Sequence, residues 1–153
     1  MNIETINMNS EICVAVKYDA VDFTNMAELM GEGYQKLMTY VVENGKQFIG
    51  CPYCKYYNGS EDFMRFDIEL GIPVNEPLPE KDGIYMSKTF EGKAITAMHI
   101  GAYKEIEKTY TPMMQYMSDN DLQSTGDYYD YYVSDPAETP ESELLTKVIF
   151  PIR

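Results

Sequence analysis

An internal repeat of predicted elements limits how this chain can fold more than any other feature of its sequence. In each half, a β-type run is followed by a helical stripe and then by two more β-type runs. Tyr129 and Tyr132 follow Tyr53 and Tyr56 at one and the same offset, and Pro151 follows Pro73 at a slightly longer one. Two residues inserted in the second copy would explain the difference. So long a period predicts a duplication within one domain of residues 1–153, and not an array of short repeats.

The first half, about residues 11–74, contains a clear helical pattern between predicted strands. Ile12 to Tyr18 is an apolar, β-branched run that predicts a strand, and two further strands are predicted at about 51–58 and 64–70. Between the first strand and these two, apolar residues recur at the three- and four-residue spacing of one buried helical face. They are Met26, Leu29, Met30, Gly33, Leu37, Met38 and Val41.

The second half, about residues 84–153, follows a linker at about 75–83 that contains two prolines and an Asp-Gly pair. We predict a hairpin of strands at 84–90 and 93–100, and further strands at 128–134 and 144–150. A second helical stripe lies between them, formed by Tyr103, Ile106, Tyr110, Met113, Met114 and Met117.

These patterns predict an α+β fold. Each half is a strand-helix-strand-strand unit, and the pair can form a pseudo-two-fold, curved antiparallel sheet with two helices on one face. The length of 153 residues fits one such domain.

The charge of the chain is strongly acidic, with 25 Asp and Glu against 12 Lys and Arg and a net charge of −13. This field repels phosphate backbones, so we expect no direct binding of nucleic acid. The same field concentrates cations, although solubility alone would also account for it. The 14 Tyr and 11 Met residues supply amphipathic rings and adaptable thioethers, which either bind varied ligands or fill the core.

Several sequence features predict a cytoplasmic, reduced protein. The amino terminus has no basic segment followed by an apolar run, and no stretch of 18 apolar residues occurs, so neither export nor a membrane is expected. The odd set of Cys13, Cys51 and Cys54 favours free thiols. With the first predicted strand starting near Ile12, we expect no DNA-binding module ahead of it.

Four short motifs, in this order and spacing, resemble the GyrI-like small-molecule-binding domains of bacteria. These domains also form the effector-binding part of several multidrug-sensing transcription activators. The resemblance spans most of the chain. Its motifs are Asp67-Ile68-Glu69-Leu70-Gly71-Ile72-Pro73-Val74, His99-Ile100-Gly101-Ala102-Tyr103, Tyr129-Asp130-Tyr131-Tyr132-Val133-Ser134-Asp135-Pro136, and Leu144-Leu145-Thr146 with Phe150-Pro151-Ile152.

The resemblance implies a concave sheet whose open face binds apolar, often cationic, ligands above a central carboxylate and aromatic rings. Members that sense cationic drugs typically have Glu at the position matched here by Asp130. The shorter Asp keeps the charge but implies a deeper site or a looser contact with the ion. Gly101-Ala102-Tyr103 also replaces the common Gly-Pro-Tyr, which matters more for the turn than for binding.

Strand alternation gives a candidate site without the family. If Tyr129 and Tyr131 face the helices, the side chains between them face the opposite side, and the repeat places their counterparts of the first half beside them. A carboxylate among phenol rings suits a cation. The alternative is an edge strand with solvated phenols. The ligand-binding candidates are Asp130, Tyr132, Tyr128, Tyr56 and Cys54, with Glu69 and Asp67 as candidates for a second acid, and His99.

His99 has several interpretations. At the end of a predicted strand it could act as a general base, contact a ligand or bind haem, since the fold class is related to haem-binding proteins. It could also simply tie a turn to its neighbours. Cys51-x-x-Cys54 lacks the second ligand pair of a zinc site, so neither a metal nor a cofactor is predicted.

Three functions therefore remain open. The first is a stand-alone domain that binds or sequesters a lipophilic, cationic or aromatic compound in a Tyr-lined acidic cleft. The second is a hydrolase of reactive electrophiles, with Glu69 or Asp130 and a tyrosine as acid and base. The third is an acidic module that binds a protein partner such as gyrase. A homodimer is also left open.

Overall fold

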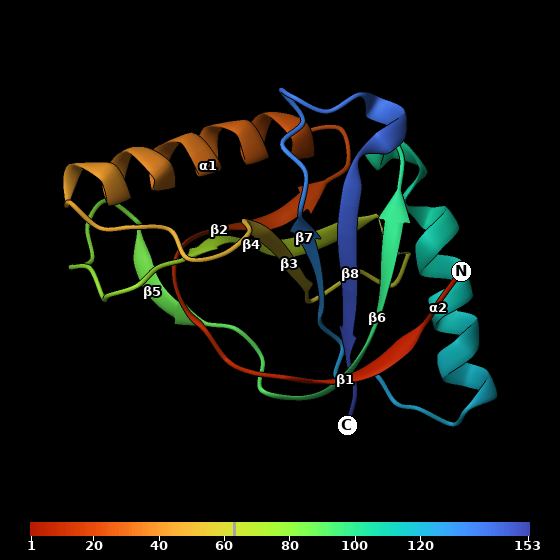
Figure 1. Cartoon of the computed structure of the whole chain (residues 1–153). Helices are drawn as coiled ribbons and strands as arrows, with labels where there is room; N and C mark the ends of the chain where they lie inside the picture. Colours follow the sequence, from red (N-terminus) through yellow and green to blue (C-terminus); the bar gives the residue numbers. More distant parts are fainter. Residues whose placement is uncertain (63) are drawn as a thin grey trace. The chain divides into compact units, whose positions relative to one another are not determined.

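The computed structural model describes residues 1–62 and 64–153. The chain divides into two compact units (Figure 1). The first unit contains residues Asn9–Phe90, and the second contains Met1–Met8 together with Glu91–Arg153. No helix among the described residues is both long and apolar enough to cross a membrane.

The first unit is a four-stranded antiparallel sheet with one helix. The strand order is β3-β4-β2-β5, and the helix α1 follows β2 in the chain. The elements are β2 (Ile12–Asp22), α1 (Met26–Glu43), β3 (Tyr53–Tyr57), β4 (Arg65–Pro73) and β5 (Tyr85–Lys88).

The apolar stripe of α1 determines how the helix packs on its sheet. Gly33 lies so close to β4 that an added Cβ would come within 2.6 Å of the Leu70 side chain, so the absence of a side chain permits this approach. Gly45, with φ of +66°, ends the helix because this left-handed conformation suits glycine. The buried helix residues are Met26, Gly33, Leu37, Tyr40 and Val41, whereas Met38 of the predicted stripe is exposed.

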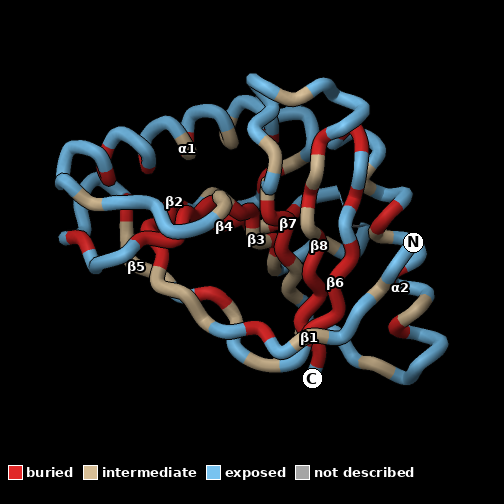
Figure 2. Tube along the Cα trace, viewed as in Figure 1, coloured by how far each residue is buried: buried red, intermediate tan, exposed pale blue. Residues whose placement is uncertain are grey.

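The second unit repeats this arrangement. Its antiparallel strand order is β1-β6-β8-β7, and its core packs α2 against the sheet through Met113, Met117, Val148 and Phe150. In both units the buried residues concentrate on the strands (Figure 2). The elements are β1 (Glu4–Met8), β6 (Gly92–Ile100), the 3-10 helix η1 (Tyr103–Glu105), α2 (Glu107–Asp119), β7 (Tyr128–Tyr132), the 3-10 helix η2 (Glu141–Glu143) and β8 (Leu145–Pro151).

Strand register confirms the duplication. Cys54 lies opposite Leu70 in the first unit, and Asp130 lies opposite Val148 in the second. The two pairs are related by the same two offsets that the tyrosines and prolines of the sequence repeat show. The predicted fold class, α+β with a duplicated strand-helix-strand-strand unit, is therefore correct.

The predicted hairpin of 84–90 with 93–100 is wrong. β5 pairs with β2, and β6 pairs along Gly92–Thr96 with β1, a strand that the sequence analysis did not predict. The backbone N–H and C=O groups of β5 and β6 thus form hydrogen bonds with different partner strands, so the two strands do not have to pair with each other. β1 was missed because its five residues, ETINM, are largely polar and only its last residue is buried.

Candidate functional site

Asp130 is a buried carboxylate in the middle of β7. Its side chain is 2% exposed, and the Tyr110 hydroxyl of α2 donates a hydrogen bond to its Oδ2 atom. Burial raises the pKa of Tyr110 well above its ordinary value, and the nearby Asp130 charge adds to this effect. The Tyr110 hydroxyl therefore stays protonated and remains a donor to the acid.

Aromatic rings surround this carboxylate on its own face of the second unit. The Tyr110 ring meets Tyr128 edge to face, with centroids 5.3 Å apart, and Tyr128 lies 5.2 Å from Phe150. At the other end of β7, Tyr132 meets Tyr103 of η1 with a centroid distance of 5.4 Å. Asp130 thus lies in an aromatic, largely dehydrated environment.

The predicted facing of β7 is wrong. Tyr128, Asp130 and Tyr132 point toward α2 and η1, as their contacts with Tyr110 and Tyr103 show, and not away from the helical layer. Every residue of this strand is Tyr or Asp, so alternation gives two sets of side chains but no polarity difference that tells which set is covered. The edge strand with solvated phenols is also ruled out, because the middle three residues are buried.

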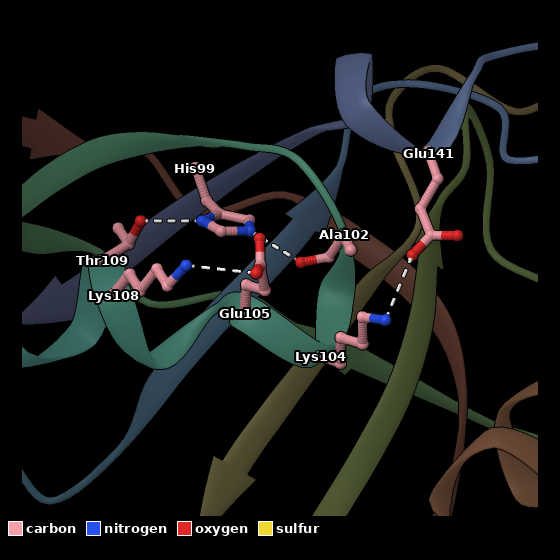
Figure 3. A network of polar contacts seen from close by, with 7 residues as sticks. All are labelled: His99, Ala102, Lys104, Glu105, Lys108, Thr109 and Glu141. Carbon is pink, nitrogen blue, oxygen red and sulfur yellow. Dashed lines mark hydrogen bonds and ion pairs between the residues drawn. The ribbon is translucent and has the colours of Figure 1, made fainter.

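His99 ties the end of β6 to the start of α2 (Figure 3). Its Nε2 atom lies 2.9 Å from the Ala102 carbonyl oxygen, and its Nδ1 atom lies 2.8 Å from Thr109 Oγ1. A carbonyl can only accept, so Nε2 carries the proton and, in the neutral ring, Nδ1 accepts from the Thr109 hydroxyl. Both nitrogens are thus used inside the turn, which is the structural role considered for His99.

Ion pairs lie on the surface beside this turn (Figure 3). Lys108 Nζ lies 3.1 Å from Glu105 Oε1. The hydrogen bond from Lys108 and its positive charge lower the pKa of Glu105. Lys104 of η1 lies 4.0 Å from Glu141 of η2. These side chains are exposed, so the pairs contribute little stability.

Glu69 forms a second carboxylate cluster, on the helix-free face of the first unit. It is 7% exposed and accepts hydrogen bonds from the hydroxyls of Tyr53 at 2.8 Å, Tyr85 at 2.6 Å and Ser87 at 3.1 Å. Burial first, and then the interaction with Glu69, raises the pKa of Tyr53 and of Tyr85. Three hydroxyl donors thus converge on one buried acid.

The sequence analysis missed the residues around Glu69. Tyr85 and Ser87 come from β5, whose partner was mispredicted, and Gly71 provides the space for Tyr53. A Cβ at Gly71 would lie 2.3 Å from the Tyr53 ring. Burial raises the pKa of the adjacent Cys13 thiol to about 12 despite a hydrogen bond with Tyr53 that acts in the opposite direction, so Cys13 is an unreactive thiol.

The remaining predicted residues belong to the first unit. Tyr56 donates to the Met26 sulfur at 3.6 Å, so Tyr56 and Cys54, two residues before it on β3, face α1. Asp67 is half-buried and accepts from Ala20 N at 2.8 Å and Asn58 Nδ2 at 2.9 Å, bonds that lower its pKa. Asp67 therefore holds backbone and side-chain groups of its own unit in place by hydrogen bonds.

Two surface hollows of the first unit are lined, among residues 9–62 and 64–90, by neither Asp130 nor Glu69. One of about 450 Å³ lies beside α1, and one of about 460 Å³ lies next to the β2–α1 turn. The first is lined by Glu32, Gln35, Lys36, Thr39, Tyr40, Glu43, Lys81, Asp82 and Ile84. The second is lined by Asp22, Phe23, Thr24, Ser60, Asp62, Met64 and Arg65.

Solved structures share this fold at low sequence identity. The C-terminal domain of EcmrR is 18% identical, with a TM-score of 0.84 over 99% of this chain and 97% of that domain. In an EcmrR–DNA complex the TM-score is 0.86, at 18% identity over 99% of this chain, which spans only 57% of that longer chain. SAV2435 bound to tetraphenylphosphonium is 10% identical, with a TM-score of 0.67 over 100% and 94% of the two chains.

A hydrolase encoded by lin2189 from Listeria innocua is 17% identical, with a TM-score of 0.68 over 99% of this chain and 91% of that one. A search of curated proteins finds no match. The sequence model of the GyrI-like small molecule binding domain, in contrast, matches residues 1–153. The chain therefore belongs to the GyrI-like family of small-molecule-binding domains.

Proposed function

We propose that this chain binds a lipophilic, cationic or aromatic small molecule at the carboxylate of Asp130. The observation that carries the proposal is the burial of this acid among the rings of Tyr110, Tyr128 and Tyr132. Membership of a small-molecule-binding family and the likeness to SAV2435, which is bound to a lipophilic cation, support it.

The physical basis is the pairing of a desolvated negative charge with ring faces. A cation among aromatic rings gains about 2 kcal/mol when it is desolvated, and a carboxylate supplies the opposite charge. Because Asp130 is covered, side chains that cover it have to move when a ligand enters. The Tyr110 hydroxyl supplies one hydrogen bond, to the Oδ2 atom of the acid.

Tetraphenylphosphonium is the first probe. We expect it to raise the melting temperature and to bind in isothermal titration calorimetry, because a ligand stabilises the state that binds it. Asp130→Asn keeps the shape and removes the charge, so its Kd should rise about tenfold or more. Glu69→Gln is the matched control and should leave the affinity unchanged. The proposal would be contradicted if the wild type did not bind aromatic cations, or if both variants changed the Kd equally.

Hydrolysis at Glu69 is the second candidate. It is supported by three hydroxyls that converge on one buried carboxylate. Such an anion can take a proton from the attacking water and pass it to the oxygen of the opened electrophile, while the Tyr53 or Tyr85 hydroxyl donates a hydrogen bond to that oxygen. Incubation with a panel of reactive electrophiles tests this function. Turnover that is lost in Glu69→Gln and kept in Asp130→Asn would assign it to Glu69, and no turnover in the wild type would remove it.

A further inference from the structure

The Thr146 hydroxyl on β8 is a buried polar group that the fold leaves unsatisfied. Thr146 is 0% exposed, and its Oγ1 atom has no hydrogen-bond partner among residues 1–62 and 64–153. A buried hydroxyl without a partner costs free energy, and such groups in native proteins call for a specific explanation. A ligand group that completes the bond is one such explanation.

The neighbours of Thr146 do not supply the missing bond. In the sheet, Thr146 lies directly opposite His99 of β6 on one side and Tyr132 of β7 on the other. His99 uses both ring nitrogens, on Ala102 and Thr109, and has none left for Thr146.

A second buried threonine in the same unit shows the ordinary solution. Thr96 lies on the opposite face of β6, and its Oγ1 atom donates to the Val148 carbonyl oxygen at 2.9 Å. Thr146 makes no such bond to the backbone of the part of the chain that the structure describes. A threonine hydroxyl in this sheet can therefore bond to the backbone, and the lack of such a bond is specific to Thr146.

Thr146 faces the same layer as Asp130. Tyr132 is the direct partner of Thr146, and Asp130 precedes Tyr132 by two residues on the same face of β7. Side chains in this diagonal relation on adjacent antiparallel strands lie roughly 7–8 Å apart. One ammonium group can therefore donate an N–H to the carboxylate and another to the threonine hydroxyl.

We propose that the Thr146 hydroxyl is a second polar contact for the ligand of Asp130. The site then selects aromatic ammonium ions that carry N–H donors over quaternary cations that carry none. This inference rests on the proposed binding function and deepens it, because it names the chemical class of the ligand. It also assigns a role to Thr146, a residue of the fourth sequence motif that was not among the predicted ligand-binding residues.

The test uses two matched probes, (naphthalen-1-ylmethyl)ammonium and its N,N,N-trimethyl analogue. Isothermal titration calorimetry measures both on the wild type, on Thr146→Val, which removes the hydroxyl at nearly constant shape, and on Thr146→Ser, which keeps it. We expect Thr146→Val to weaken the primary ammonium about tenfold and the trimethyl probe less than about twofold. Thr146→Ser should keep the preference for N–H donors.

Thr96→Val is the matched control, because it removes a buried hydroxyl on the other face. It should lower the melting temperature and leave the ratio of the two affinities unchanged. Thr146→Val should not lower the melting temperature, because it removes a group without a partner.

Equal effects of Thr146→Val on both probes, or no effect on either, would overturn the role of Thr146 while leaving binding at Asp130 intact. If the wild type binds neither these probes nor tetraphenylphosphonium, the binding function and this inference fail together.

Discussion

The two units share one scaffold but place their buried acids on opposite faces of their own sheets. In the first unit, Glu69 lies on the helix-free face under three hydroxyl donors, and in the second unit Lys147 occupies the equivalent position opposite Tyr131. In the second unit, Asp130 lies on the helix-covered face, where the first unit has Cys54. A duplicated fold thus fixes the backbone while each copy acquires its polar site independently, and the two sites can serve different purposes.

Substitution of Gly71 should have the largest effect on stability, and this position also distinguishes the two units. Gly71 lies opposite Tyr53, whereas its counterpart Ile149 lies opposite Tyr129, so only the first unit needs a glycine there. Gly71→Ala would place a Cβ 2.3 Å from the Tyr53 ring, and we expect a loss of about 3 kcal/mol in the free energy of unfolding by urea.

Gly31→Ala is the control for this change. Nothing lies within 4 Å of a Cβ at Gly31 of α1, so this substitution should stabilise the chain by about 0.5–1 kcal/mol. A stable Gly71→Ala protein would mean that Tyr53 can leave its place, and the Glu69 cluster would then not be rigid.

The two acids should differ in their contribution to stability. Glu69→Gln weakens charge-assisted bonds from three hydroxyls, which we expect to cost about 2 kcal/mol. Asp130→Asn retains an oxygen that Tyr110 can bond to and relieves the burial of a charge, so its cost should be about 1 kcal/mol or less. Urea unfolding at neutral pH measures both, and the reverse order would break the assignment of Glu69 as structurally satisfied and Asp130 as available to a ligand.

Alkaline pH should affect the first unit through Cys13. Its thiol has a pKa of about 12 in the folded chain against an ordinary value of 9.0, so the folded state holds its proton longer than the unfolded one. The stability from this group is complete below about pH 9 and is lost as the pH rises toward 12, at up to about 1.4 kcal/mol per pH unit.

Cys13→Ala tests this dependence. The variant should unfold with a smaller decrease in stability between pH 9 and pH 11 than the wild type, measured by urea unfolding at each pH. Cys51→Ala, at a position outside the core, is the control and should keep the wild-type slope. An unchanged slope in Cys13→Ala would show that buried tyrosines alone cause the alkaline loss.

The sequence predicted what depends on local pattern. Helical stripes and β-branched runs identified both α-helices and seven of the eight strands that the structure describes, and the spacing of tyrosines and prolines revealed the duplication. Pairing partners are not local, so the hairpin of β5 with β6 was mispredicted and β1 was missed. Alternation also fixes only which side chains share a face, and in a strand composed of Tyr and Asp nothing indicated which face the helix covers.

In the candidate site too, the features that depend on local sequence were predicted and those that depend on tertiary packing were not. Asp130 and its flanking tyrosines were identified from the motif, but they lie on the helix-covered face and not on the open face where strand alternation had put them. Tyr110 was recognised only as part of a helical stripe, because its bond to Asp130 depends on tertiary packing. The open hydroxyl of Thr146 has no sequence signal, since threonine is common in strands for its shape alone.

The strand β1 imposes an order on biosynthesis. Its residues emerge from the ribosome before the whole first unit, but their ladder partners, Gly92–Thr96, are made only after that unit is complete. Until then, the nascent segment has an unsatisfied edge, and its few apolar side chains and the charge of Glu4 limit the risk of pairing with another chain. The weak β signal that hid this strand from sequence analysis is thus also a safeguard during synthesis.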